Sequence, residues 1–215
     1  MDLLHLFNRC LNANYTTVEN QGDYAIQQIG TKLYLFFEWS DSATDWKNNF
    51  DFPAKPYKEM GTTWHCHRGF LKVWKSIEPH VKSAIMKPTV KSITIVGYSH
   101  GAAIATLCHE YVWFNRPELR DKLQGYGFGA PRVFWGVMSD ELKQRWKNFH
   151  IIRNFNDIVT YMPPAIFGFR HVNQVITIGQ RENIDTSTTR LIPVAAHMPD
   201  NYIASLKLYD KKGGE

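Results

Sequence analysis

Apolar side chains along the chain recur with two different periods. Residues 2–12 and 70–86 carry them at helical spacing, so both segments are predicted to be amphipathic helices. Residues 33–39 and 92–96 are short, unbroken runs of β-prone side chains, which is typical of buried strands. By the same criteria we expect further strands over 24–29, 125–128, 150–155 and 172–178, and further helices over 102–114, 137–147 and 201–208.

The order of these elements predicts the fold class. Strands that alternate with helices of this length form βαβ units, because parallel neighbours need a crossover connection. We therefore expect an α/β protein with a mainly parallel central sheet and helices on both faces. No internal repeat, low-complexity tract or Gly/Ser linker divides the sequence, which predicts one domain over residues 1–215.

Composition narrows the protein class without deciding the function. The chain contains no run of 18 apolar residues, so no transmembrane segment is expected. The first dozen residues, MDLLHLFNRCLN, lack the features of a signal peptide, and the three cysteines fit neither a disulfide framework nor a paired zinc motif. Together these features make a cytoplasmic location the default expectation, with secretion by a non-classical route or through a removed leader as the alternative. The net charge of +5 favours an anionic partner, but no basic run points to nucleic acid.

Ser99 is the first candidate for chemistry, in the pentapeptide Gly97-Tyr98-Ser99-His100-Gly101. The two glycines lack Cβ atoms, so a strand can turn abruptly into a helix and present the serine at the apex. The predicted strand before this motif and the predicted helix after it supply that context. The start of the helix also brings the backbone N–H of His100 to the place where an oxyanion would form. Ser99 is therefore predicted to be a nucleophile.

A serine nucleophile needs a histidine as its base and an Asp or Glu that orients the histidine. In a fold of this kind both follow the serine along the chain, first the carboxylate and then the histidine. Asp157 follows a predicted strand in a loop at the carboxyl end of the sheet, where a turn aspartate that binds local N–H groups is the alternative. His197 lies in a loop before the last helix and is the predicted base. His171 is expected instead to make a structural hydrogen bond.

A metal site is a competing interpretation of the histidines. His65 and His67 alternate along one segment around Cys66, so they would share a face of a strand, and His109 or His171 would have to complete the ligand set. No second cluster at ligand spacing supports this interpretation. We therefore expect neither a metal ion nor another cofactor.

Several segments in order resemble the class 3 lipases, a fungal triacylglycerol lipase-like branch of the α/β-hydrolases. The resemblance covers about residues 30–207. It rests on FEWSDSATDW (37–46), His67-Arg68-Gly69-Phe70, the Ser99 pentapeptide, YGFGAPRV (126–133), the segments 156–164 and 169–171, and residues 197–206. It implies the α/β-hydrolase fold and a triad that corresponds here to Ser99, Asp157 and His197.

The resemblance also implies an oxyanion hole and a lid. Ser40 occupies the position of the second oxyanion donor, beside the His100 N–H, although Glu38-Trp39 replaces the usual Arg-Gly before it. The lid corresponds to residues 43–52. His100 itself stands where the family usually has leucine.

These features predict a serine hydrolase that cleaves a carboxylic ester in a lipid through an acyl-enzyme on Ser99. Its substrate is expected to be a lipid ester, met at a membrane or a lipid–water interface. A phospholipase A-type activity is the alternative within the same chemistry, since the basic charge favours anionic surfaces. A non-catalytic α/β-hydrolase scaffold that serves as a binding module is the alternative from another class, and the complete triad argues against it.

Overall fold

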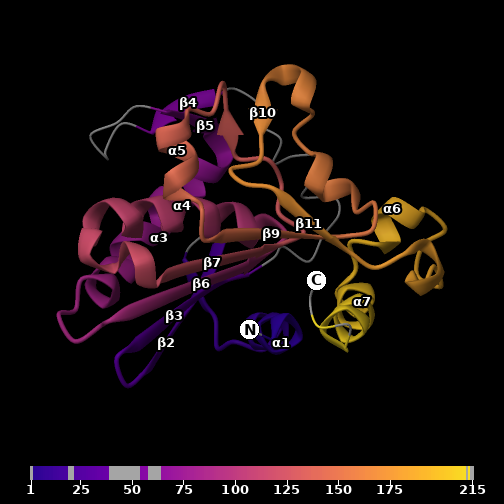
Figure 1. The fold of residues 1–215 in the computed structure, drawn as a ribbon, viewed down its shortest axis with the longest axis horizontal. Coiled ribbons are helices and arrows are strands. Elements are labelled where there is room, and N and C mark those ends of the chain that lie inside the picture. Colours follow the sequence, from indigo (N-terminus) through magenta and orange to yellow (C-terminus); the bar gives the residue numbers. More distant parts are fainter. Residues whose placement is uncertain (1, 19–21, 39–53, 58–63, 212, 214–215) are drawn as a thin grey trace.

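The computed structural model of the protein describes residues 2–18, 22–38, 54–57, 64–211 and 213. Its centre is a seven-stranded sheet in the order β1-β2-β3-β6-β7-β9-β11 (Figure 1). The first two pairings, β1 with β2 and β2 with β3, are antiparallel, and the other four are parallel. The strands are β1 (Thr16–Val18), β2 (Gly22–Ile29), β3 (Lys32–Phe37), β6 (Ser92–Tyr98), β7 (Leu123–Phe128), β9 (Phe149–Asn154) and β11 (Val175–Ile178). This confirms the predicted α/β class.

Helices cover both faces of the sheet, as Figure 1 shows. On one face lie α3 (Arg68–Ile85) and α4 (His100–Asn115); on the other lie α1 (Leu3–Leu11) and α7 (Pro199–Lys211). Alternate residues of each strand serve the two layers because strand side chains point to opposite faces. In β6, for example, Ile93 and Ile95 join the core under α3 and α4, whereas Val96 and Tyr98 join the core under α1 and α7.

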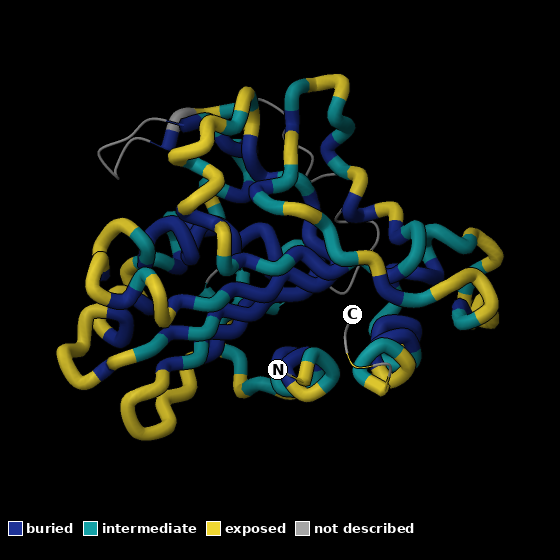
Figure 2. The backbone as a smooth tube through the Cα atoms, in the orientation of Figure 1, coloured by how far each residue is buried: buried dark blue, intermediate teal, exposed yellow. Residues whose placement is uncertain are grey.

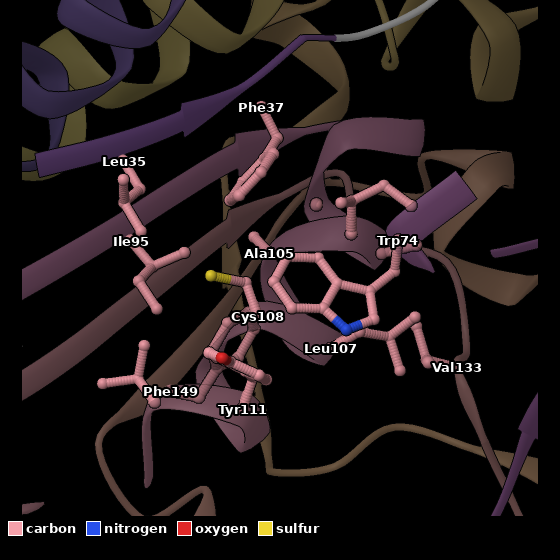
Figure 3. Close-up of a cluster of buried hydrophobic side chains, with 14 of the residues drawn as sticks. Leu35, Phe37, Trp74, Ile95, Ala105, Leu107, Cys108, Tyr111, Val133 and Phe149 are labelled. Atoms are coloured by element: carbon pink, nitrogen blue, oxygen red, sulfur yellow. The ribbon is translucent and has the colours of Figure 1, made fainter. Parts of the chain in front are cut away.

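The larger core is a layer of aliphatic, aromatic and thiol side chains between the sheet and helices α3 and α4 (Figure 3). Trp74 of α3 and Cys108 of α4 are fully buried in it. The helix α4 carries small residues on the side that meets the sheet, which lets its backbone come close to β6 and β7. Figure 2 shows the consequence, since the inner strands and α4 are dark along most of their length.

A second, smaller sheet was not predicted from the sequence. It contains β4 (Ala54–Tyr57), β5 (Trp64–His67), β8 (Phe134–Trp135) and β10 (Phe169–Arg170), in the order β10-β8-β5-β4, with every pairing antiparallel. Strands of two to four residues are too short to show a period. Tertiary packing forms this sheet, because Trp64 stacks on Phe134 and meets Trp146 edge-on.

The remaining helices are short. The predicted helix over 137–147 is only α5 (Asp140–Arg145), because the Ser139 hydroxyl accepts a hydrogen bond from the Leu142 N–H and caps it there. The others are α6 (Ile192–Ala195) and four 3₁₀ helices: η1 (Pro117–Lys122), η2 (Ile158–Tyr161), η3 (Ala165–Phe167) and η4 (Arg181–Asn183). Within the described part of the chain, no helix combines the length and apolar character needed to cross a bilayer.

Two sequence predictions fall outside the described residues. The lid expected over 43–52 and the oxyanion donor expected at Ser40 both lie within the range 39–53.

Candidate active site

The sharp turn at Ser99 joins β6 to α4. Ser99 has φ 57° and ψ −124°, a left-handed conformation that is strained for a residue with a Cβ atom. Its N–H donates to the Phe128 carbonyl at 2.9 Å. A Cβ on Gly97 would collide with the backbone of Gly101, and one on Gly101 would collide with the backbone of Phe37. The two glycines are therefore required because strand, helix and neighbouring strand touch here backbone to backbone.

Ser99, His197 and Asp157 form a continuous line of hydrogen bonds. The Ser99 Oγ lies 2.8 Å from His197 Nε2, and His197 Nδ1 lies 2.8 Å from Asp157 Oδ2. Ser99 and Asp157 are fully buried and His197 is 6% exposed. The structure thus brings together three residues separated by up to 98 positions in the sequence. This is the arrangement in which an imidazole takes a proton from a hydroxyl while a carboxylate orients the ring.

The Asp157 carboxylate accepts three hydrogen bonds. The Val159 N–H donates to Oδ1 at 2.9 Å, and His197 Nδ1 and the Tyr202 hydroxyl both reach Oδ2, the hydroxyl at 2.6 Å. Burial and the nearby Asp157 charge raise the pKa of Tyr202 well above its ordinary value, so the phenol stays protonated and donates. The carboxylate is therefore held in one orientation from two sides.

The loop that carries His197 is fixed by its backbone. The Tyr98 hydroxyl donates to the His197 carbonyl, and the Tyr98 ring stacks on the imidazole with the ring centroids 5.2 Å apart. The Asn154 amide donates to the Ala196 carbonyl at 3.0 Å, and the Asn201 amide donates to the Ala195 carbonyl at 2.8 Å. Side chains from β6, β9 and α7 therefore hold this loop over Ser99.

Gly129 follows β7 and lies against the acid and the base. It has φ +59°, and a Cβ there would lie 3.0 Å from Asp157 Oδ2 and 3.0 Å from His197 Cε1. The site consequently needs a residue without a side chain at this position for two reasons, backbone conformation and space.

Of the two oxyanion donors predicted from the sequence, His100 lies within the described residues. His100 is the first residue of α4, so its N–H belongs to the positive end of a 16-residue helix next to Ser99. Its imidazole meets Phe70 edge-on, with the ring centroids 5.4 Å apart, and burial lowers the pKa of His100 to about 4. A neutral ring beside Ser99 leaves the backbone N–H as the group with partial positive charge.

Three of the other histidines have structural partners. His171 Nε2 lies 2.8 Å from the Thr160 carbonyl, which agrees with the predicted structural role. His67 caps α3 by accepting from the Phe70 N–H at 3.3 Å, and His109 Nε2 lies 3.1 Å from the Arg145 carbonyl. Among the residues that the structure describes, no three His, Cys, Asp or Glu side chains are grouped so that they could bind a metal ion.

Sequence reasoning missed the residues that support the three central ones. Gly129 lies in the YGFGAPRV segment, and a glycine directly after a buried strand is a signal for a close approach. The sequence did not single out Tyr98 and Tyr202, because an aromatic residue in a predicted strand or helix is normally assigned to the hydrophobic core. Their hydroxyl groups became informative only once their partners were known.

Comparisons with known proteins identify the family. The family model "Lipase (class 3)" matches residues 34–167, which is more than half of the chain. The chain belongs to the class 3 lipase family. The range that the family model matches includes Ser99 and Asp157, whereas α1, His197 and Tyr202 lie outside it.

Two relatives and one solved structure illustrate the similarity. A secreted mono- and diacylglycerol lipase of Fusarium solani is 27% identical over 139 residues, which are 62% of this chain and 40% of that protein. A lipase of Rhizomucor miehei is 26% identical over 167 residues, 74% of this chain and 46% of that protein. The solved structure is a triacylglycerol lipase whose catalytic centre is a serine protease triad. It superposes with a TM-score of 0.62 at 19% identity, covering 82% of this chain and 74% of that one.

The chain shares its fold with these lipases. The similarity to solved lipases shows the α/β-hydrolase fold, as the family resemblance implied. The chain spans less than half the length of the Fusarium and Rhizomucor relatives.

The expectation of a cytoplasmic location is wrong. Relatives from Fusarium, Penicillium and Malassezia are named as secreted lipases, which points to the outside of the cell. The segment 2–12, whose lack of signal-peptide features suggested the cytoplasm, is mostly the folded helix α1, packed on the sheet and on α7. Its sequence therefore reports on packing and carries no information about export.

Proposed function

We propose that this chain hydrolyses carboxylic esters of lipids through an acyl-enzyme on Ser99. The observation that carries the proposal is the hydrogen-bonded line from the Ser99 hydroxyl through His197 to the buried Asp157, set on a strained turn between strand and helix. The lipase family supplies the substrate class, because its named members act on acylglycerols.

The acylation step follows from the positions of the two His197 nitrogens. Nε2 takes the Ser99 proton as Oγ forms a bond to the ester carbonyl carbon, and the carbonyl π electrons move onto its oxygen. Asp157 stabilises the resulting imidazolium at Nδ1. When the tetrahedral intermediate collapses, the bond to the alcohol oxygen breaks and that oxygen takes the proton from Nε2.

Deacylation repeats these steps with water. His197 removes a proton from water as its oxygen attacks the acyl carbon, and the Ser99 oxygen leaves with the proton that Nε2 returns. The carboxylic acid is released and the hydroxyl is restored. The three hydrogen bonds to Asp157 support this cycle, because they hold the carboxylate still while the ring gains and loses charge.

The negative oxygen of both intermediates needs donors. We assign the His100 N–H as one and Ser40 as the second. Losing one such donor costs on the order of 10² to 10³ in rate, about 3 to 4 kcal/mol. The position of His100 at the start of α4 supports the first assignment; the family resemblance supports the second.

Replacing the nucleophile tests the function. Ser99→Ala should lower kcat for a soluble p-nitrophenyl butyrate by several orders of magnitude, since the nucleophile is lost. Ser205→Ala, at a buried serine of α7, is the matched control and should keep wild-type activity. Wild-type turnover by Ser99→Ala would overturn the proposal, and it would then favour a non-catalytic scaffold with a contaminating esterase.

A second candidate function is phospholipase A-type hydrolysis, which the net charge of +5 favours for anionic substrates. Rates should be compared between a triacylglycerol emulsion and phosphatidylglycerol vesicles, and along p-nitrophenyl esters of increasing chain length across their solubility limit. A rate jump at that limit indicates a lipase that acts at interfaces. Faster release of fatty acid from phosphatidylglycerol than from triacylglycerol would assign the phospholipase activity.

A further inference from the structure

An exposed group of apolar side chains lies beyond β8 and beside β10. Val137 is 92% exposed, Ile166 87%, Phe167 57% and Trp135 40%. We call these four residues the apolar tip. They come from two segments about thirty residues apart, β8 with the residues after it and the 3₁₀ helix η3. Exposed apolar side chains that are grouped on two neighbouring segments favour a contact surface.

The two segments of the tip are bonded to each other. The Trp135 indole N–H donates to the Phe167 carbonyl at 2.8 Å, and the Gly136 N–H donates to the Gly168 carbonyl at 3.0 Å. Gly168 adopts φ +88°, and a Cβ there would lie 2.8 Å from the Trp135 indole nitrogen. The exposure of the tip is therefore built into the fold by tight contacts. In Figure 1 the chain between η2 and β10 stands out at the top beside β10, and Figure 2 colours its outermost part as exposed.

Three arginines contact the segment 161–165, which leads into η3 and the tip. Arg170 is exposed in β10, next to the tip, and donates to the Ala165 carbonyl at the base of η3 at 2.8 Å. Arg132 donates to the Pro163 carbonyl at 3.0 Å. Arg153 lies over the ring of Tyr161, 4.9 Å from its centroid. Burial and the nearby charges of Arg170 and Arg153 lower the pKa of Arg132, so the three cations act on one another.

This cationic group has no acidic counterpart in the described part of the chain. None of its three arginines forms an ion pair with a carboxylate of a described residue. Like charges held together in this way favour an external anion. Arg153 lies near the end of β9, the strand that leads to Asp157, and Arg132 and Arg153 both act on His171, so the cationic group lies near the loop that carries Asp157.

We propose that the apolar tip inserts into the surface of an anionic lipid bilayer, with Arg132, Arg153 and Arg170 on the headgroup phosphates. The most exposed side chains of the tip are aliphatic, its indole is less exposed, and guanidinium groups contact the segment that leads to it. This order matches the depth profile of a bilayer interface. A protein partner would need a shaped complement to a protruding surface, whereas a bilayer adapts to it. The purpose of such docking, delivery of lipid to Ser99, rests on the proposed function; the docking itself does not.

Vesicle flotation with the Ser99→Ala protein tests the docking without hydrolysing the lipid. The protein should bind vesicles of equimolar phosphatidylcholine and phosphatidylglycerol, and bind pure phosphatidylcholine more weakly. Val137→Ser/Ile166→Ser should weaken binding to the mixed vesicles by about tenfold or more, since two large apolar side chains no longer leave water. Arg153→Gln/Arg170→Gln should weaken binding to the mixed vesicles and flatten its dependence on salt.

Ile26→Ser/Ile29→Ser is the matched control, because both side chains are exposed, 40% and 54%, on the β2–β3 hairpin. This double variant, made in the Ser99→Ala protein, should bind the mixed vesicles as strongly as the Ser99→Ala protein itself. Unchanged melting temperatures would show that the variants fold. Equal loss of binding in the tip and hairpin variants would overturn the proposal, as would no vesicle binding at all. Light scattering gives a further test. If the parent protein were oligomeric and the tip variant were monomeric but still bound vesicles normally, the tip would contact a second copy of the chain, and the proposal would be overturned.

The same tip substitutions in a chain that keeps Ser99 separate docking from chemistry. Hydrolysis of soluble p-nitrophenyl butyrate should stay at the wild-type rate, while hydrolysis of vesicle or emulsion lipid should fall. If Ser99→Ala retained activity, the proposed function would fail and the flotation result would still decide the docking.

Discussion

At the scale of single residues, the donors around Asp157 decide how the site holds its charge. A fully buried carboxylate is stable only if its lone pairs are satisfied, and here Val159, His197 and Tyr202 satisfy them. Two of these donors share Oδ2, so the phenol competes with the imidazole for the same oxygen. We infer that Tyr202 is a positioning residue that also sets how strongly Asp157 acts on His197.

Tyr202→Phe tests this role. Without the phenol hydroxyl the Asp157 carboxylate is held less firmly, so it orients the imidazole less well. We therefore expect kcat for a soluble ester to fall about tenfold and KM to stay unchanged. The negative charge of Asp157 would act more strongly on the imidazolium. The acid limb of the pH profile of kcat should therefore move to higher pH.

The pH profile separates this role from a purely structural one. Tyr111→Phe, at a buried tyrosine of α4, is the control and should change neither kcat nor the profile. A Tyr202→Phe enzyme whose profile matches the wild type would contradict the role, even if its activity were lower.

Gly129 gives a second test at the residue scale. Gly129→Ala would place a methyl group 3.0 Å from Asp157 Oδ2 and from His197 Cε1. Relieving this contact requires Asp157 or His197 to shift by a few tenths of an ångström. Since a misplacement of about 1 Å in such a site costs on the order of 10² in rate, we expect kcat to fall by about threefold to tenfold. Gly30→Ala is the matched control, because Gly30 has φ +58°, close to the +59° of Gly129, and nothing lies within 4 Å of its added methyl. Both variants should lose similar stability, and only Gly129→Ala should lose kcat.

At the scale of elements, α1 supports the candidate site from outside the matched family range. Its Phe7 ring packs 5.1 Å from Tyr98, 4.8 Å from Phe128 and 5.5 Å from Tyr202, between ring centroids. The start of the helix is tied to α7, because the Leu4 N–H donates to Asp210 at 3.0 Å. The first helix of the chain therefore braces the two tyrosines that hold His197 and Asp157.

Phe7→Ala should be strongly destabilising for this reason. Removing a fully buried phenylalanine ring costs about 3 to 5 kcal/mol of unfolding free energy, measurable by urea denaturation. We also expect a lower kcat in the folded fraction, because both tyrosines lose a packing partner. Leu208→Ala, at a leucine of α7 that is 43% exposed, should change neither quantity much. A Phe7→Ala protein as stable as the Leu208→Ala protein would show that α1 is dispensable.

At the scale of the whole molecule, buried histidines make stability depend on pH. Burial lowers the pKa of His109 to about 3 and that of His171 to about 4, from an ordinary value of 6.5. The unfolded chain therefore binds more protons than the folded one in the range between these values. The resulting stability is fully present above about pH 6.5 and is lost as the pH falls toward 4 and 3.

Melting temperatures between pH 7 and pH 4 check this prediction. The wild type should lose stability steadily over that range. His109→Gln should have a lower melting temperature at pH 7 and a shallower fall toward acid, since one of the protonation sites is gone. His80→Gln, at an exposed histidine of α3, should follow the wild type. Identical slopes for His109→Gln and wild type would refute the assignment.

The sequence by itself determined the main layers of this protein. The period of the apolar residues predicted α1, α3, β3 and β6 to within a few residues, because long elements that bury one face leave a strong periodic signal. The glycines around Ser99 predicted the turn for a related reason, since close approach of two backbones excludes every side chain. Asp157 and His197 were predicted from their order along the chain and their place in loops.

Only the tertiary structure decided what surrounds these residues. The small sheet of β4, β5, β8 and β10 is made of strands too short to carry a period, so its pairing depends on contacts between distant segments. The hydroxyl groups of Tyr98 and Tyr202 gained their roles from partners 99 and 45 positions away. The exposed apolar tip likewise depends on β8 meeting η3. Local sequence encodes local periodicity, whereas hydrogen bonds between distant residues exist only once the chain has folded.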